Sequence, residues 1–183
     1  VEKADPTIYQ RERKISSFEE AARDVRYTFL GRVARELHAS AVLVAHTADD
    51  QAETLLMHLL RGSGLHGLQG MQEFTTWRSP IDDGTVRVLR PLLGVWRQEI
   101  LDYCEKRNIS YRNDTANVSL RFTRNRIRHK LIPVLKQFNP KLIQVLSRQA
   151  NILRDESEYL DSLAKTALES IVLKAETGRR VLN

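Results

Sequence analysis

The stretch that most constrains the fold of this chain is a five-residue apolar run, AVLVA at residues 41–45. It is apolar on both faces and follows a helical pattern, which predicts a central strand of a parallel sheet. The helix before it begins at the capping box SFEE, where Ser17 and Glu20 are spaced for mutual hydrogen bonding, and it continues to about His38. A helix leading into a buried strand is typical of an α/β fold.

The rest of the chain continues this alternation. Further elements are predicted as helices over residues 48–61 and 95–107, a strand over residues 86–93, and a strand or loop over residues 1–14. From residue 120 the chain is predicted to be helical to its end, interrupted at Pro133 and restarted at Asn139 and Pro140. With so few strands, the expected fold is the later part of a doubly wound α/β domain with a partly parallel sheet, followed by a helical extension.

Composition excludes several classes of protein. Hydrophobic residues make up 42% and charged residues 28% of the 183 residues, as in a folded globular protein. No apolar stretch approaches the ~20 residues of a membrane span. Cys104 is the single cysteine, which excludes a disulfide or a cysteine metal cluster within the chain and favours a reducing compartment, the cytoplasm. The net charge of +6 is compatible with a polyanionic partner.

An acidic cluster follows the apolar run directly. His46 lies just past the strand, where ligands bind in open parallel sheets. On the next helix, Asp50 and Glu53 are one turn apart and are predicted to point away from the core. Such a pair can hold an ammonium group or a divalent cation, or supply a base. The alternatives are that these acids, Asp49 above all, complement the helix dipole, and that His46 is structural.

The glycine-rich string GSGLHG at residues 62–67 matches G-x-G-x-x-G. A dinucleotide fingerprint must follow a strand and open a helix, whereas this string follows a helix. We therefore interpret it as a helix C-cap and a tight loop.

A basic run, RFTRNRIRHK at residues 121–130, is the counterpart of the acidic cluster. A helix would place four polar side chains on one side: Arg121, Arg124, Asn125 and Arg128. Ile127, Leu131 and Val134 would lie on another side. Guanidinium groups bind phosphates bidentately, so this face suits an RNA backbone. The alternatives are a solvated helix face, or arginines tied to a carboxylate such as Asp114.

Four segments together resemble the tRNA(Ile)-lysidine synthetases: SFEEAARDVRY, AHTADDQAETLLMHLLRGSGLHGL, RVLRPLL and NDTANVSLRFTRNRIRHKLIP. They cover most of residues 17–133, and the H-x-x-D-D-Q-x-E-T and R-N-x-I-R strings are specific. The resemblance implies a Rossmann-like N-type ATP pyrophosphatase (PP-loop) fold. Residues 1–115 would be the C-terminal part of the catalytic domain, and residues 116–183 a helical linker subdomain. It also implies a reaction: ATP adenylates the wobble cytidine of tRNA(Ile), and lysine then displaces AMP.

The resemblance also implies roles for particular residues. His46, Asp50 and Glu53 would line a lysine pocket, and no residue is expected to be a metal ligand. Arg26 and the cluster Arg121, Arg124, Asn125 and Arg128 would lie near nucleotide or tRNA phosphates. Arg61 would anchor a loop or touch RNA, and Asn117 would be architectural. The expected substrates and partners are ATP with Mg²⁺, L-lysine and tRNA(Ile) with a CAU anticodon, without a membrane and with a homodimer left open.

One family feature is not found in the sequence: the phosphate loop S-G-G-x-D-S. The chain is therefore expected to be a fragment that is inactive by itself, because adenylation needs a loop that cradles pyrophosphate. Two other functions stay open. A tRNA 2-thiolase of the same fold would usually carry more cysteines than Cys104. A non-catalytic RNA-binding module would explain the arginines but would leave Asp50 and Glu53 without a purpose.

Overall fold

The computed structural model of the chain describes residues 3–112, 120, 122–176 and 179–182. By spatial proximity of its Cα atoms the chain divides into two compact units, Val1–Thr47 with Gln72–Leu93 and Ala48–Met71 with Gly94–Asn183. No helix in the described part of the chain is long and apolar enough to cross a membrane. The expected boundary between a catalytic domain and a linker subdomain at residue 115 stays a prediction.

The first unit begins with a helix, so the strand or loop predicted for residues 1–14 is wrong. Helix α1 spans Pro6–Arg13, and the carboxylate of Asp5 caps it by accepting a hydrogen bond from Thr7 N at 2.8 Å. Pro6 stands in the first turn, where its missing N–H removes no helical hydrogen bond. A proline disrupts a helix in its interior, but at this position it is compatible with a helix start.

Helix α2 spans Phe18–Glu36 and confirms the predicted helix start at Ser17, whose Oγ accepts a hydrogen bond from Glu20 N at 3.4 Å. Tyr27 and Ala34 of α2 are buried against Val86 and Val88 of the sheet. Gly31 of α2 faces Val86, since a Cβ atom at Gly31 would lie 3.4 Å from Val86 Cβ, an ordinary contact distance.

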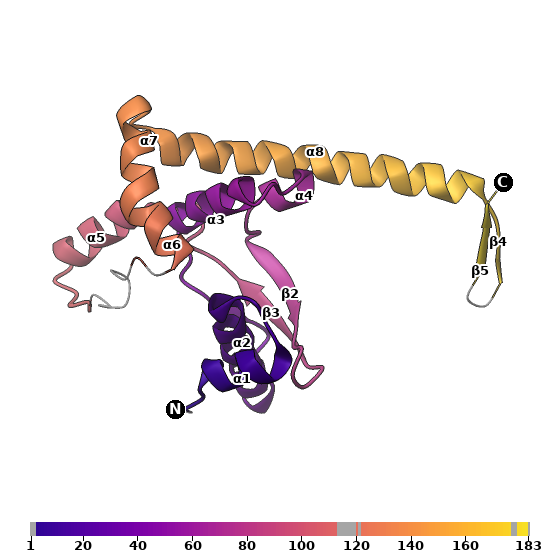
Figure 1. The fold of residues 1–183 in the computed structure, drawn as a ribbon, viewed down its shortest axis with the longest axis horizontal. Coiled ribbons are helices and arrows are strands. Elements are labelled where there is room, and N and C mark those ends of the chain that lie inside the picture. The colour runs from indigo at the N-terminus through magenta and orange to yellow at the C-terminus, as the bar shows by residue number, and fades with distance from the viewer. Residues whose placement is uncertain (1–2, 113–119, 121, 177–178, 183) are drawn as a thin grey trace. The chain divides into compact units, whose positions relative to one another are not determined.

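The sheet of the first unit has three strands in the order β1-β3-β2, and Figure 1 shows β2 beside β3. They span Val42–Leu43 for β1, Phe74–Arg78 for β2 and Thr85–Leu89 for β3. β1 pairs with β3 in parallel, with Leu43 opposite Leu89, and β2 pairs with β3 antiparallel. The α/β class and the parallel pairing are confirmed.

Two details of the sheet differ from the prediction. β1 lies at the edge of the described sheet rather than at its centre, and Leu43 is 68% exposed. β2 was not predicted, because the sequence FTTWR has no continuous apolar run. In the structure its residues alternate between exposed and half-buried. Its antiparallel pairing makes the sheet mixed.

The second unit is helical apart from its C-terminal hairpin. Its first helices are α3 (Ala48–Leu60), α4 (Leu65–Leu68) and α5 (Arg97–Lys106). The later helical segments are α6 (Thr123–Arg126), the π-helical turn η2 (Ile127–Leu131), α7 (Ile132–Phe138) and α8 (Leu142–Ile171). α8 runs beside α3 and α4 (Figure 1). The core joins Ala52 and Leu56 of α3 to Ile127, Ile132 and Ile143.

The predicted helix over residues 95–107 is confirmed as α5, on which Ile100, Leu101 and Cys104 are half-buried. Asn117, which was expected to be architectural, lies outside the described residues.

The chain was predicted to be helical from residue 120 to its end, and this is wrong for the segment after α8. Strands β4 (Val172–Glu176) and β5 (Arg179–Leu182) pair antiparallel after α8. Pro133 does not interrupt the helix: α6, η2 and α7 form one continuous helical run from Thr123 to Phe138, and the π-helical turn η2 lies directly before Ile132 and Pro133. The break at Asn139 is confirmed: its carbonyl accepts a hydrogen bond from Leu142 N, and its Oδ1 accepts one from Lys141 N at 2.9 Å.

Candidate functional site

The carboxyl ends of β1 and β3 lie at the same edge of the sheet, because the two strands are parallel. His46 comes three residues after the end of β1 and is half-buried. Arg90 follows the last residue of β3 directly and is buried. This edge is where ligands bind in open α/β sheets. The structure therefore places His46 where the sequence predicts it and adds Arg90, which the prediction missed.

The predicted acidic cluster opens α3, in the second unit. Asp49 and Asp50 both lie in the first turn of α3. Asp49 Oδ2 accepts a hydrogen bond from Arg97 N at 2.9 Å, so Asp49 caps the start of α5. Asp49 therefore has a structural role. One interpretation of the sequence placed such a role at the start of its own helix, α3, whereas the helix that it caps is α5.

Asp50 and Glu53 bind two arginines from the basic run. Glu53 Oε2 accepts from Arg124 Nε at 2.9 Å, and Glu53 Oε1 accepts from Arg128 Nε at 2.6 Å. Asp50 Oδ1 accepts from Nη2 of both arginines, at 3.1 Å each. We call these four residues the charge quartet. Its two carboxylates and two guanidinium groups balance, so the acidic and basic clusters of the sequence form one neutral site.

The charge quartet corrects the prediction that Glu53 points away from the core. Its side chain is 1% exposed, against 19% for Asp50, 31% for Arg124 and 23% for Arg128. The helical periodicity of α3 assigned Glu53 to a polar face correctly. Periodicity could not show that α6 and η2 cover that face with their own charges. A buried carboxylate needs such partners, because an unpaired buried charge is costly.

Each arginine of the charge quartet keeps one nitrogen out of these contacts. Both use Nε and Nη2, and neither Nη1 makes a hydrogen bond to any residue that the structure describes. Burial acts to lower the pKa of Arg128, but its hydrogen bond to Glu53 and the charges of Glu53 and Asp50 outweigh that effect and raise the pKa. Arg128 is therefore a fixed cation.

The other predicted site residues are not part of the charge quartet. Arg26 is exposed on α2, with its guanidinium carbon 5.8 Å from the centre of the Tyr27 ring. Arg61 is exposed just past the end of α3. Asn125 is 9% exposed in α6. Arg121 lies outside the described residues. Arg26 and His46 belong to the first unit, and the rest of the described set belongs to the second.

A resident metal ion does not fit the described residues. They contain no group of three or more His, Cys, Asp or Glu side chains placed to hold one. The carboxylates of Asp50 and Glu53 are already bound by guanidinium groups. We therefore assign no step of a reaction to Mg²⁺ at these residues.

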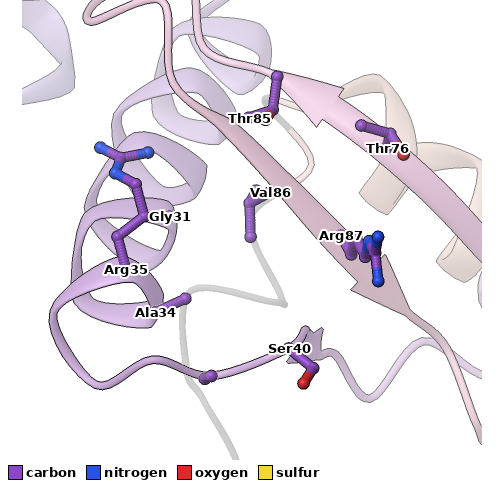
Figure 2. Close-up of a pocket in the computed structure, with 9 residues that line it drawn as sticks. Gly31, Ala34, Arg35, Ser40, Thr76, Thr85, Val86 and Arg87 are labelled. Carbon is purple, nitrogen blue, oxygen red and sulfur yellow. The ribbon is translucent and has the colours of Figure 1, made fainter.

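A cavity of about 360 Å³ lies in the first unit, between the C-terminal half of α2 and the β2–β3 hairpin (Figure 2). Gly31, Arg35, Ser40, Val86 and Arg87 are among its lining residues. Ser40 precedes β1 and Val86 is near the start of β3, so this cavity is at the amino ends of the parallel strands. None of the site residues predicted from the sequence lines it.

Comparison with protein families gives a match to the PP-loop domain over residues 3–135. The tRNA(Ile)-lysidine synthase of Dehalococcoides mccartyi is 39% identical over 175 residues, which are 96% of this chain and 37% of that protein. The Geobacter sulfurreducens enzyme of the same name is 43% identical over 88% of this chain and 33% of its own length. The Gloeobacter violaceus enzyme of the same name is 42% identical over 90% of this chain and 49% of its own length. The chain thus spans a third to a half of these relatives.

Among solved structures, the U34-tRNA thiolase NcsA from Methanococcus maripaludis is similar, with a TM-score of 0.52. The match covers 71% of this chain and 42% of the thiolase, at 19% sequence identity. At this identity the likeness shows a shared fold and not a shared reaction. The expected α/β fold of the PP-loop type is confirmed.

Proposed function

The chain belongs to the PP-loop domain family, and from this premise we propose that the full-length protein is a tRNA(Ile)-lysidine synthase. ATP adenylates the C2 oxygen of the wobble cytidine, with release of pyrophosphate. The ε-amine of lysine then attacks C2, loses a proton, and AMP leaves with the oxygen. The observation that carries the proposal is the similarity to enzymes of this name, at 39–43% identity over 88–96% of the chain.

Within this function, the charge quartet supports different roles for its two carboxylates. Glu53 is 1% exposed and accepts three hydrogen bonds from two arginines. We assign it the role of a positioning residue that holds Arg124 and Arg128. Asp50 is more exposed, at 19%, and is the carboxylate that a lysine ammonium group can reach with less rearrangement. His46 is proposed as a further site residue, at the carboxyl edge of the sheet of the first unit.

The arginines of the charge quartet can serve tRNA and the carboxylates together. Their Nε and Nη2 atoms hold Asp50 and Glu53, while Nη1 makes no hydrogen bond to the described residues. A phosphate oxygen at Nη1 would gain a charge-assisted hydrogen bond without breaking those contacts. Arg26, Arg61, Arg121 and Asn125 are proposed as further contacts to nucleotide or tRNA. A cytoplasmic location is proposed for the whole protein.

The direct test is the chemistry of the wobble nucleoside. The full-length protein is incubated with ATP, isotope-labelled lysine and a tRNA(Ile) transcript with a CAU anticodon. Nucleoside mass spectrometry should then find labelled lysine attached to the wobble cytidine. A transcript with uridine at that position is the control and should stay unmodified. Sulfur incorporation in place of lysine would assign the protein to the thiolases, and tRNA binding without modification would make it an RNA-binding module.

The assigned roles are separated by lysine kinetics. Asp50→Asn should raise the lysine KM by roughly tenfold or more, because a charged hydrogen bond to an ammonium group contributes about 1.5–3 kcal/mol. Glu158→Gln is the matched control, since Glu158 is exposed on α8 and makes no ion pair with any described residue. An unchanged lysine KM in Asp50→Asn would remove Asp50 from the lysine site.

A further inference from the structure

Arg90 is a buried cation without a carboxylate partner. It is 6% exposed, and arginine is almost never this buried unless it is paired. No aspartate or glutamate among the described residues forms an ion pair with it, and its two side-chain hydrogen bonds go to neutral oxygen atoms. An isolated buried charge is strongly unfavourable. Its burial therefore calls for an anion that the described residues do not supply.

The guanidinium group of Arg90 is held by one nitrogen only. Nη1 donates to Gln72 O at 2.7 Å and to Thr75 Oγ1 at 3.1 Å. Nε is buried and has no hydrogen-bond partner in the described part of the chain, and Nη2 makes no hydrogen bond there either. The Nε–Nη2 edge is one that arginine offers to carboxylates and phosphates bidentately. Two neutral anchors thus fix the group and leave that edge for an oxyanion.

The position of Arg90 in the sheet is also that of a ligand-binding residue. Side chains alternate along a strand, so Arg90 continues the buried row of Val86 and Val88, on the face that α2 covers. It directly follows Leu89, which is paired with Leu43 of the parallel strand β1. Arg90 therefore lies at the carboxyl edge of the two parallel strands, where open α/β sheets bind ligands.

We propose that Arg90 is an oxyanion-binding residue, whose Nε–Nη2 edge takes two oxygen atoms of a phosphate or carboxylate group of a substrate. The proposed function supplies both sources of this chemistry: the phosphates of ATP and tRNA, and the α-carboxylate of lysine. Only the identity of the oxyanion rests on that function. The binding of an oxyanion rests on the burial and hydrogen bonding of Arg90.

Inorganic phosphate is the first probe. The full-length protein is melted in phosphate and in chloride of equal ionic strength, and the increment in melting temperature measures binding to the folded state. Arg90→Met keeps the apolar stem and removes the charge, so it should abolish the increment whatever it does to the baseline. Arg87→Met is the matched control, because Arg87 is an exposed arginine of the same strand, and it should keep the increment. An undiminished increment in Arg90→Met would overturn the proposal.

A second measurement needs no folded variant. In protein labelled with ¹⁵N-arginine, the buried Nε–H of Arg90 should give a separate resonance that moves on addition of phosphate. The resonance of exposed Arg87 reports only general ionic effects. A stationary Arg90 resonance at saturating phosphate would refute oxyanion binding there.

Substrate kinetics identify the oxyanion. Arg90→Lys keeps the charge but loses the bidentate edge, so the KM of the substrate bound there should rise roughly tenfold to a hundredfold. A rise for ATP, tRNA or lysine assigns the group to that substrate, and no rise for any of them contradicts the proposal. If the unaltered protein forms no lysidine, the proposed function fails, while the phosphate melts and the Arg90 resonance still decide whether Arg90 binds an oxyanion.

Discussion

Glu53→Gln is the substitution whose effect the structure defines most sharply. The glutamine has nearly the same shape, but it replaces a carboxylate that accepts three hydrogen bonds from Arg124 and Arg128, at 2.6–3.0 Å. One amide oxygen can still accept, whereas the NH₂ group would face guanidinium N–H groups. Two positive charges would then share the single carboxylate of Asp50.

The expected cost can be estimated from these contacts. Breaking a buried ion pair by removing one partner costs about 3–5 kcal/mol. The arginines are 31% and 23% exposed, so water recovers part of that loss. We expect a loss of about 2–4 kcal/mol in the free energy of unfolding. For a chain of this size, that corresponds to a fall of roughly 4–16 °C in melting temperature.

Urea denaturation of Glu53→Gln, followed by circular dichroism, measures this loss. Glu158→Gln is the control for a change of charge alone, and it should stay within about 0.5 kcal/mol of the unaltered protein. Adding Arg128→Met to Glu53→Gln should recover part of the loss, because the second change removes an uncompensated buried cation. A loss below about 0.5 kcal/mol, or no recovery in the double variant, would refute the reasoning.

Three further outcomes are expected. Gly70→Ala should lower the free energy of unfolding by about 1–3 kcal/mol, because Gly70 has φ +67° and a Cβ atom there would lie 2.7 Å from Gln51 Oε1. Gly62 has φ +75° but nothing within 4 Å of such a Cβ atom, so Gly62→Ala should lose less stability in the same thermal melt. Burial, followed by the charge of Glu20, raises the pKa of Asp24, so the stability contributed there falls as pH rises from the ordinary aspartate range through the raised pKa. Asp24→Asn should therefore raise the melting temperature at neutral pH and give no gain at acid pH, and a constant gain across a calorimetric pH series would contradict this. In the full-length protein, Arg61→Ala should flatten the salt dependence of tRNA binding by up to about one log–log unit with little change in melting temperature, whereas Arg124→Ala should lower the melting temperature as well; filter binding across a salt series separates the two.

The parts of the fold that could be predicted are those with a strong local signal. Ser17 and Glu20 define a helix start through a short-range hydrogen bond. The run at residues 41–45 is apolar on both faces, which predicts a strand. β2 gave no such signal, because its stability comes from pairing with β3 rather than from its own composition. Pro133 was misinterpreted because the helical run from Thr123 to Phe138 passes through it, with the π-helical turn η2 directly before it, and a local pattern does not reveal such a turn.

The candidate site shows the same limit at longer range. The sequence singled out Asp50, Glu53, Arg124 and Arg128 as candidate site residues. It predicted a lysine ammonium group as the partner of the acids and phosphates as the partners of the arginines. Their pairing joins residues 71–78 positions apart and depends on how α6 and η2 pack on α3. Arg90, by contrast, did not stand out in the sequence, because a single arginine after an apolar strand pattern resembles an exposed strand end. Its significance lies in its burial, which only the fold reveals.

Helix α8 combines two environments in one continuous rod. Up to Ser157 it packs on the core of its unit, and from Glu158 to Ser170 every side chain is exposed, including Tyr159, Leu160 and Leu163. A helical stretch of this length is only marginally stable in water without tertiary contacts. Backbone amides should therefore exchange with solvent by local fraying in the outer half and by opening of the whole unit in the inner half. The helix would carry a gradient of local unfolding free energy along its axis, with its steepest change next to Ser157.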